Sequence, residues 1–296
     1  MARYIVSFLI LNYKTADMTK QTVDLLRKHQ PRESYCVVIV DNGSEDGSYE
    51  TLKREYKDQD DIFVLACAKN EGFARGNNVG YDFIKQRDMS EYIVCMNSDV
   101  FIEQPDFIEC IQKIHEETGF YMLGPDIINK QSKHCNPHRE KLFSMKDVNR
   151  RIVNQWIFKK YFQVKKLLHI QDKLYILEDW MDALANKERS RIAWDKAMTD
   201  VVLHGSCLIF SREYINAFSQ AFCPDTFLYF EEDIRCFECV NMGYRVQYDP
   251  RIQVRHLEGV SSAIEKDKRY QKKEAYVKNI YDSAKVLKRK MKEQGK

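Results

Sequence analysis

Short apolar runs alternate with amphipathic stretches through the first 130 residues of the chain. The apolar runs lie at 5–11, 36–40, 62–66, 92–96 and 121–123, and the helix-like stretches lie at 15–28, 47–56, 73–86 and 105–118. Short apolar runs between helices are typical of parallel strands that are buried on both faces of a sheet. The pattern therefore predicts an α/β fold with a mostly parallel central sheet and flanking helices.

Polar side chains stand where these predicted strands end. Asn12, Asp41, Asn70 and Asp99 each lie at or just after the end of an apolar run. Ligands of open α/β sheets bind beyond the carboxyl ends of the strands. We therefore expect these four residues to converge on one edge of the sheet.

The alternation breaks after residue 129. Residues 130–196 are rich in basic and aromatic side chains and are interpreted as a helical insert, and the ordered pattern resumes over 197–265. Residues 266–296 predict one helix with an apolar stripe in 3-4 spacing. The stripe consists of Val277, Ile280, Ala284, Leu287 and Met291.

The net charge of +3 is unevenly distributed along the 296 residues. Residues 266–296 contain twelve Lys or Arg against four Asp or Glu, so the rest of the chain is slightly acidic. This distribution argues against general nucleic-acid binding. No stretch reaches the ~18 apolar residues of a membrane-spanning helix.

Nine cysteines are scattered through apolar runs, which is typical of a reducing compartment and predicts a cytoplasmic protein. Cys236 and Cys239 form an isolated C-x-x-C pair. Without a second pair or a histidine partner, this spacing favours buried thiols over a zinc or redox site.

The segment 70–80, NEGFARGNNVG, follows the third strand and opens a helix. Glycines at a helix start allow close backbone approach, and the free amides there favour a diphosphate. Arg75 adds a planar donor for a phosphate or a base edge. A tight packing loop is the alternative.

Asp99 ends the sequence Asn-Ser-Asp after an apolar run. A carboxylate in that position is costly unless it is exposed in a cleft or bound to a cation. Mg²⁺ commonly takes one or two protein carboxylates together with substrate phosphates. A metal site at Asp99, beside Ser98, is therefore expected, and a loop-capping role is the alternative.

Glu231, Glu232 and Asp233 place three carboxylates in a row after aromatic residues. Neighbouring negative charges raise one another's pKa, which suits a general base. An acidic helix N-terminus would explain the same pattern. His256 follows another apolar segment, and alone it would more commonly be structural.

The order of these motifs resembles the family 2 glycosyltransferases of the GT-A fold, in particular their rhamnosyltransferase-like branch. The resemblance rests on NYK at Asn12, VDNGSEDGS from Val40, NEGFARGNNVG from Asn70, MNSD ending at Asp99, HGSCLIFSRE from His204, FLYFEED from Phe227, GYRV from Gly243 and HLEGVSS from His256. It implies a nucleotide-sugar-binding part over 1–129 and an acceptor-binding catalytic part over 197–265.

The resemblance also implies roles for individual residues. The expected donor-binding residues are Asn12, Asp41, Asn70, Arg75, Asn78 and Ser98, with Asp41 at the nucleotide base. Asp99 and His256 would hold a divalent metal, Mg²⁺ or Mn²⁺. The family base lies in a Glu-Asp pair. Alignment on Gly243-Tyr244 places Glu231-Glu232 at this pair, whereas strict identity places Glu232-Asp233 there, so the base is left open, with Glu232 favoured over Asp233. Ile234-Arg235 replaces the usual Asp-Leu, so acceptor contacts are expected to differ.

The implied reaction is transfer of a hexosyl or rhamnosyl group from a nucleotide diphosphate to a glycan or lipid-linked glycan, with inversion, in cell-envelope polysaccharide assembly. A single displacement needs one catalytic carboxylate, whereas a glycosidase needs two. A sugar-phosphate nucleotidyltransferase and a non-catalytic partner of another transferase are the alternatives. The basic helix 266–296 is expected to contact an anionic membrane surface on the cytoplasmic side, whereas its apolar stripe would equally suit packing on the protein's own domain or on a second subunit.

Overall fold

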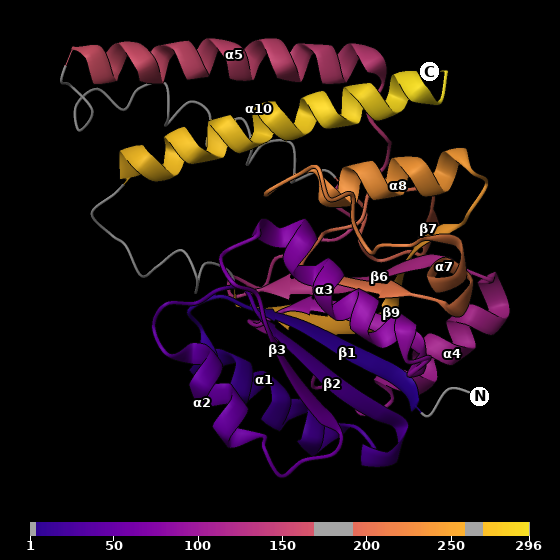
Figure 1. Ribbon diagram of the computed structural model, residues 1–296. Coiled ribbons are helices and arrows are strands. Elements are labelled where there is room, and N and C mark those ends of the chain that lie inside the picture. The colour runs from indigo at the N-terminus through magenta and orange to yellow at the C-terminus, as the bar shows by residue number, and fades with distance from the viewer. Residues whose placement is uncertain (1–3, 169–191, 258–268, 296) are drawn as a thin grey trace.

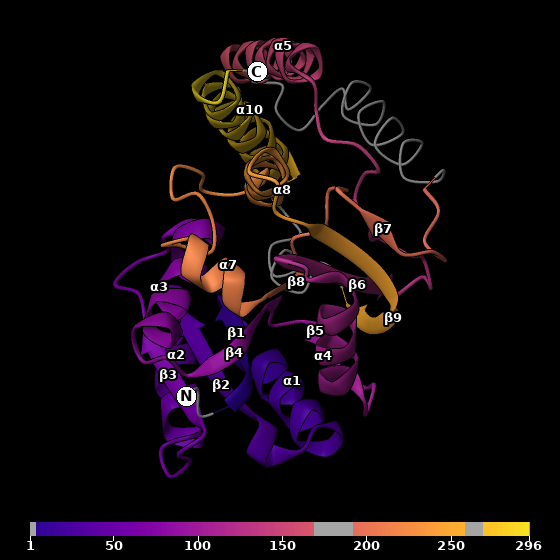
Figure 2. The same cartoon turned by 90° about the vertical axis from the view of Figure 1, so that its right-hand side faces the viewer.

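The computed structural model describes residues 4–168, 192–257 and 269–295. A curved sheet of nine strands forms the centre, with helices on both of its faces (Figure 1). Two long helices, α5 (Met145–Leu167) and α10 (Arg269–Glu293), lie side by side in a further layer outside the sheet and its covering helices (Figures 1 and 2).

The first four strands pair in parallel, as the sequence pattern predicts. They are β1 (Tyr4–Asn12), β2 (Tyr35–Asp41), β3 (Ile62–Ala66) and β4 (Ser90–Asn97), arranged β3-β2-β1-β4. In the register, Asn12 pairs with Asp41, and Leu11 pairs with Asn97. The strand ends are thus level, and the polar residues that follow them meet at one edge.

The remaining strands extend the same sheet with mixed directions. They are β5 (Val100–Phe101), β6 (Met122–Asn129), β7 (Met198–Thr199), β8 (Cys207–Phe210) and β9 (Val246–His256). β8 is antiparallel to β4 and to β6, and β9 is parallel to β6 but antiparallel to β5 and β7. The parallel character therefore belongs to the first part of the sheet.

Alternation of side chains along the strands divides the core between the two faces of the sheet. Phe8, Val37 and Val94 face a cluster with α1 (Ala16–His29), α2 (Ser48–Glu55) and α4 (Phe107–Thr118). Leu9 and Val38 face the other cluster, formed with α3 (Gly72–Gln86), α7 (Arg212–Ala217) and α8 (Glu231–Asn241). Both faces are covered, which explains the continuous apolar runs.

The apolar stripe of α10 is covered by the protein itself. Val277, Ile280, Ala284, Leu287 and Met291 are all buried. Val277 packs with Phe158 and Phe162 of α5, and the other four share a cluster with Ile234 and Phe237 of α8. The expectation that this stripe faces a membrane or a second subunit is corrected, and the alternative of a helix packed on its own domain holds, because the partners of the stripe are α5 and α8.

In the described part of the insert, residues 145–167 form a helix, whereas 130–144 form turns and isolated β-bridges; the described tail is helical over Arg269–Glu293. α5 begins with a capping box, in which Ser144 and Asp147 bond each other's backbone amides. Residues 169–191 of the insert and 266–268 of the tail lie outside the described residues, as do Glu258–Ser262 of the HLEGVSS motif. No helix among the described residues has the length and apolar content needed to cross a bilayer.

All nine cysteines are free thiols. Cys236 and Cys239 lie on the buried side of α8, and burial raises the pKa of both thiols. They pack in the apolar core beside the sheet, as the isolated C-x-x-C spacing predicts.

Candidate active site

Asn12 and Asp41 form the buried floor of the site at the ends of β1 and β2. The Asn12 amide donates a hydrogen bond of 2.7 Å to the Asp41 carboxylate, and its carbonyl accepts from the Thr15 and Thr19 hydroxyls. The other Asp41 oxygen accepts from the backbone N–H of Ser44 at 2.8 Å. Asn12 is fully buried, so it positions Asp41 and has no surface for a ligand.

Asp41 lines a cavity of ≈ 260 Å³ at this edge of the sheet. Tyr13, Ser44 and Tyr49 contribute to its walls, and Lys69 and Asn70 close it from the side of β3. The cavity combines aromatic rings, the carboxylates of Asp41, Glu45 and Glu50, and the ammonium group of Lys69. This combination is suited to a heterocyclic base and a sugar hydroxyl.

Asn42, which the sequence did not single out, ties the 70–80 loop to the end of β2. Its amide donates to the Asn70 side chain at 3.2 Å and to the Gly72 carbonyl at 3.1 Å, and its carbonyl accepts from the Glu71 N–H. Asn70 also accepts from the Gly72 N–H at 2.9 Å. The loop conformation therefore depends on Asn42 and Asn70, and the position of Asn42 directly after Asp41 was the available signal.

The next two predicted donor residues connect the same loop to a distant segment. Arg75 donates through Nε to the Pro224 carbonyl at 2.8 Å and remains more than half exposed. Asn78 is buried and uses both halves of its amide on the backbone of Phe222, at 2.9 Å each. The structure thus places Asn78 as a bridge between α3 and residue 222 instead of in the cavity.

Ser98 and Asp99 follow β4 and point to different partners. The Ser98 hydroxyl is buried and shares a hydrogen bond of 2.9 Å with the Thr15 hydroxyl, so it stabilises the loop after β1. Asp99 lies 3.2 Å from Nε2 of His256, measured from Oδ1. The backbone also joins them, because β5 pairs with the end of β9 and Val100 lies opposite His256.

The Asp99–His256 pair has the donor set of a divalent-metal site. Both side chains are about nine-tenths buried, and Nδ1 of His256 has no hydrogen-bond partner among the described residues. Carboxylate oxygen and imidazole nitrogen both suit Mn²⁺, and carboxylate oxygen suits Mg²⁺. No group of three or more possible ligands occurs in the described part of the chain, so a cation here would need oxygen ligands from its substrate.

The acidic triplet begins α8 immediately after two residues in the left-handed region. Tyr229 has φ 73° and Phe230 has φ 70°. Bulky residues rarely adopt this conformation, which costs on the order of 1–2 kcal/mol per residue. Such strain persists where packing imposes it and is common at functional sites. Here it turns the chain sharply so that the triplet starts the helix.

Glu231 is the most deeply buried carboxyl of the triplet. Burial, reinforced by the negative charge of Glu232, raises the pKa of Glu231 to about 8. Its Oε1 has no hydrogen-bond partner among the described residues. Glu231 therefore keeps its proton to a higher pH than an ordinary glutamate does.

Glu232 points across to the segment that precedes β8. A Cβ placed on Gly205 would lie 3.3 Å from the Glu232 carboxylate, so this glycine leaves the space that the carboxylate occupies. Burial raises the pKa of Glu232, while the positive charge of Arg139 opposes the rise. A carboxylate whose pKa is raised toward neutrality is the better general base.

Asp233 is bound to Arg139 by a hydrogen-bonded ion pair. The Arg139 guanidinium also stacks 3.8 Å from the centroid of the Phe143 ring. The Phe143 ring and the Asp233 carboxylate together hold the Arg139 guanidinium in place, and Asp233 is thereby kept in an ion pair. Sequence reasoning missed Arg139, which lies in the unpatterned insert.

His204 lies beside the Asp99–His256 pair. It directly precedes Gly205, and its ring centroid is 5.8 Å from that of His256. Its Nδ1 accepts from the Ser206 N–H at 3.2 Å, which leaves the ring proton on Nε2 in the neutral form. His204 thus connects the surroundings of Glu232 to His256 and Asp99. The sequence contained it only as part of the HGSC motif.

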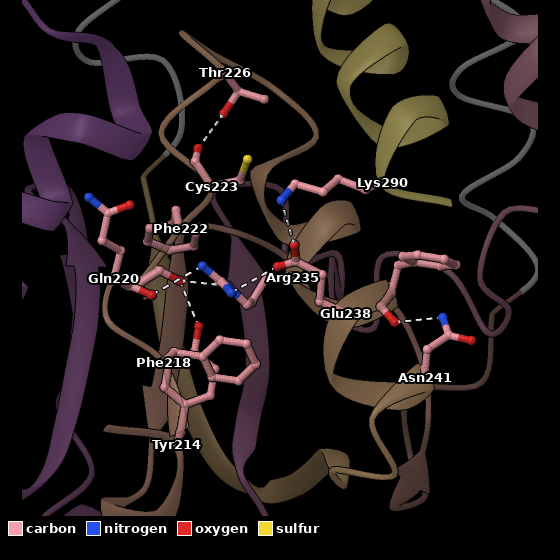
Figure 3. Close-up of polar contacts among 12 residues, drawn as sticks. Tyr214, Phe218, Gln220, Phe222, Cys223, Thr226, Arg235, Glu238, Asn241 and Lys290 are labelled. Atoms are coloured by element: carbon pink, nitrogen blue, oxygen red, sulfur yellow. Dashed lines mark hydrogen bonds and ion pairs between the residues drawn. The ribbon is translucent and has the colours of Figure 1, made fainter. Parts of the chain in front are cut away.

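Arg235 fixes α8 to the segment before it (Figure 3). It donates to the carbonyls of Gln220 and Ala221 and, at 2.8 Å, to Glu238, and it lies 4.4 Å from the Phe218 ring. This buried arginine therefore acts in packing and has no contact surface for an acceptor.

α10 braces the other side of the triplet. Lys290 lies 3.4 Å from Glu238, and the Ser283 hydroxyl donates to the Leu228 carbonyl at 3.2 Å. The rings of Tyr229 and Tyr276 meet edge to face at 4.9 Å. The strained turn before Glu231 is thus held from both sides.

A family description named glycosyl transferase family 2 matches residues 7–174, which is more than half of the chain. The chain belongs to glycosyl transferase family 2. Within this family, it is 23% identical over 245 residues to the low-salt glycan biosynthesis hexosyltransferase Agl10 of Haloferax volcanii. That match covers 80% of this chain and 64% of the hexosyltransferase.

A second relative is the poly-β-1,6-N-acetyl-D-glucosamine synthase of Staphylococcus aureus, 28% identical over 131 residues. The match covers 43% of this chain and 30% of the synthase. The family 2 chain therefore corresponds to less than two thirds of the length of either relative.

Two solved glycosyltransferases share the fold. The mannosyltransferase PcManGT from Pyrobaculum calidifontis, solved with GDP-Man and Mn²⁺, has a TM-score of 0.55 at 15% identity, covering 97% of this chain and 65% of its own. GalNAc-T7, solved with UDP, GalNAc and Mn²⁺, has a TM-score of 0.58 at 13% identity, covering 99% and 54%. The GT-A fold expected from the sequence is confirmed.

Proposed function

We propose that this chain is an inverting glycosyltransferase that transfers a hexosyl group from a nucleotide diphosphate to a hydroxyl of a glycan or lipid-linked glycan. The observation that carries the proposal is the arrangement around His204. The adjacent Gly205 faces Glu232, a carboxylate with a raised pKa, and the His204 ring lies near the Asp99–His256 pair. A base and a site for a leaving diphosphate are what a single displacement requires.

The donor would extend from the Asp41 cavity to the Asp99–His256 pair. Asp41 would accept from an N–H of the base, with Lys69 and Asn70 beside it in the cavity, and the exposed Arg75 would lie along the diphosphate. Asn12, Asn42 and Asn78 would act indirectly, because their amides are used to hold Asp41, the 70–80 loop and residue 222. Ser98 would support Asp99 through the loop after β1.

In the reaction, Glu232 would take the proton of the acceptor hydroxyl while that oxygen attacks the anomeric carbon. The bond from the anomeric carbon to the diphosphate oxygen breaks in the same displacement, so the configuration inverts. Asp99 and His256 would hold a divalent cation, which, when bound, offsets charge on the departing diphosphate. The protonated Glu231 would keep the site from carrying three negative charges.

Two further assignments accompany this function. The division into a donor part (1–129), an insert (130–196), an acceptor part (197–265) and a tail helix (266–296) is a functional proposal, since one continuous sheet joins the first and third parts. A cytoplasmic location is supported by nine free thiols, six of which are buried.

The proposal is tested by thermal unfolding with UDP-, GDP- and dTDP-sugars, with and without Mn²⁺. A matching donor should raise the midpoint, because a ligand that binds only the folded state stabilises it by RT ln(1 + [L]/Kd). The stabilising donor is then incubated with Mn²⁺ or EDTA. Release of nucleoside diphosphate that EDTA suppresses supports the transferase, whereas release of pyrophosphate would indicate a nucleotidyltransferase. No stabilisation by any donor would leave a non-catalytic partner as the better interpretation.

A further inference from the structure

The outer face of α5 carries an unusual concentration of exposed apolar side chains. Among the described residues, ten large apolar side chains are exposed, and six of them lie within 16 consecutive positions of α5 and its C-cap. They are Val153, Trp156, Ile157, Val164, Leu167 and Leu168, with Trp156 50% and Leu167 77% exposed.

These six residues form one stripe, which we call the α5 stripe. At 100° per residue they fall within roughly 60° on either side of a single line along the helix. The opposite side of α5 is already occupied, because Val148, Phe158 and Phe162 are buried against α8 and α10. α5 belongs to the outer layer of the molecule (Figures 1 and 2), and the side chains of the stripe are exposed.

Basic residues accompany the stripe. Lys146, Arg150 and Lys160 fall on the same side of the helix by the same spacing, and Lys160 lies 6.0 Å from the Trp156 ring. In all, α5 has seven basic residues and one acidic residue, and the adjacent α10 has nine and three. The layer formed by α5 and α10 is therefore strongly positive.

We propose that the α5 stripe docks on the surface of an anionic lipid bilayer, with α5 lying parallel to the membrane. A helix with tryptophan and aliphatic residues on one side and lysines and arginines among them is suited to the headgroup boundary. Charge complementarity favours this occupant over a second copy of the chain, since two copies would bring two positive layers together.

The docking would also set the position of the site. Phe143, just before α5, stacks on Phe230 with the ring centroids 5.7 Å apart, and Phe230 directly precedes the acidic triplet. One helix is about 10 Å thick, so the triplet would lie within a few helix diameters of the lipid. If the proposed transferase function holds, a lipid-linked acceptor could reach Glu232 without leaving the bilayer.

The test is flotation of the full chain with vesicles of phosphatidylcholine alone or with about one third phosphatidylglycerol. We expect flotation with the anionic vesicles, weaker flotation at high salt, and little with the neutral ones. Trp156→Ser with Ile157→Ser should reduce binding at least about tenfold. The matched control is Met242→Ser, because Met242 is 51% exposed but lies after α8.

A second pair of variants tests the charge. Lys146→Gln with Lys160→Gln should weaken binding to anionic vesicles, whereas Lys57→Gln, an exposed lysine near α2, should not. Absence of flotation at low salt, or equal losses in the control variants, would overturn the proposal. So would a dimer in solution that Trp156→Ser with Ile157→Ser converts to monomers, since the stripe would then be covered by a second copy. None of these measurements requires transferase activity.

Discussion

The Arg139 guanidinium donates a hydrogen bond to the Asp233 carboxylate, and the two form an ion pair at the first turn of α8. Asp233 is 5% exposed and Arg139 is 22% exposed, so the pair is largely shielded from water. The neighbouring Glu232 has a raised pKa and lies against Gly205. The ion pair therefore gives Asp233 surroundings different from those of Glu232, a difference that the sequence alone could not show.

Arg139→Gln should lower turnover at neutral pH by roughly tenfold. The positive charge of Arg139 holds down the pKa of Glu232, so its removal should raise that pKa further. The acidic limb of the kcat/KM profile should then move to higher pH. Arg139→Lys, which keeps the charge, should leave the limb near its original position.

The same variant should also be less stable, by roughly 1–3 kcal/mol, because Asp233 remains buried without its partner. Urea unfolding measures this change. A pH profile that is unaltered in Arg139→Gln, together with the loss of stability, would make the arginine purely structural.

Glu232→Gln should lower turnover by about 100-fold or more and leave donor affinity nearly unchanged, as expected for loss of a general base. Asp233→Asn is the matched variant on the adjacent position. It should retain more activity, because Asp233 is held by Arg139. Single-turnover kinetics with a saturating donor separate the two, and an inactive Asp233→Asn beside an active Glu232→Gln would reverse the assignment.

Asp99→Ala should abolish transfer and remove the dependence of donor binding on divalent metal. Asp99 and His256 are the two side chains proposed to bind the cation. Replacing either one therefore leaves a single side-chain ligand for the cation. Calorimetric titration of the nucleotide diphosphate with and without Mn²⁺ measures the effect. Asp106→Ala, an exposed carboxylate before α4, is the control and should behave as the wild type. Near-normal turnover of Asp99→Ala in Mn²⁺ would contradict the metal assignment.

Glu231→Gln should make stability less dependent on pH. The carboxyl pKa is raised from its ordinary 4.5 to about 8 in the folded chain, so the folded state keeps a proton that the unfolded state releases. The free energy of unfolding of the wild type should therefore fall as pH rises through about 5 to 8, by roughly 2–4 kcal/mol.

Urea unfolding at several pH values checks this expectation. The glutamine variant should lose most of the slope, and Glu116→Gln, at an exposed position on α4, should keep it. An unchanged slope in Glu231→Gln would mean that Glu231 is ionised in the folded protein.

The parallel part of the fold was predictable because its signals are local. Continuous apolar runs identify β1 to β4, and level strand ends bring Asn12, Asp41 and Asp99 to one edge. The role of Asn78 was not predictable, since its amide partner, Phe222, lies 144 residues further along the chain. The 3-4 spacing in α10 shows that the helix has an apolar face. It does not show whether that face is covered by a bilayer or, as in the structure, by α5 and α8. Arg139 has no motif around it, and only the folded chain brings it to Asp233.

The brace that α10 provides has a consequence for the order in which the protein is made. α10 follows α8 in the chain and is the later of the two to leave the ribosome, whereas the strands and helices before it can pack while synthesis continues. Until Tyr276 and Ser283 arrive, the turn at Tyr229 and Phe230 lacks two of the contacts that hold its left-handed backbone. The acidic triplet would thus reach its working position only after the sheet has formed, so incomplete nascent chains would be folded in large part but inactive.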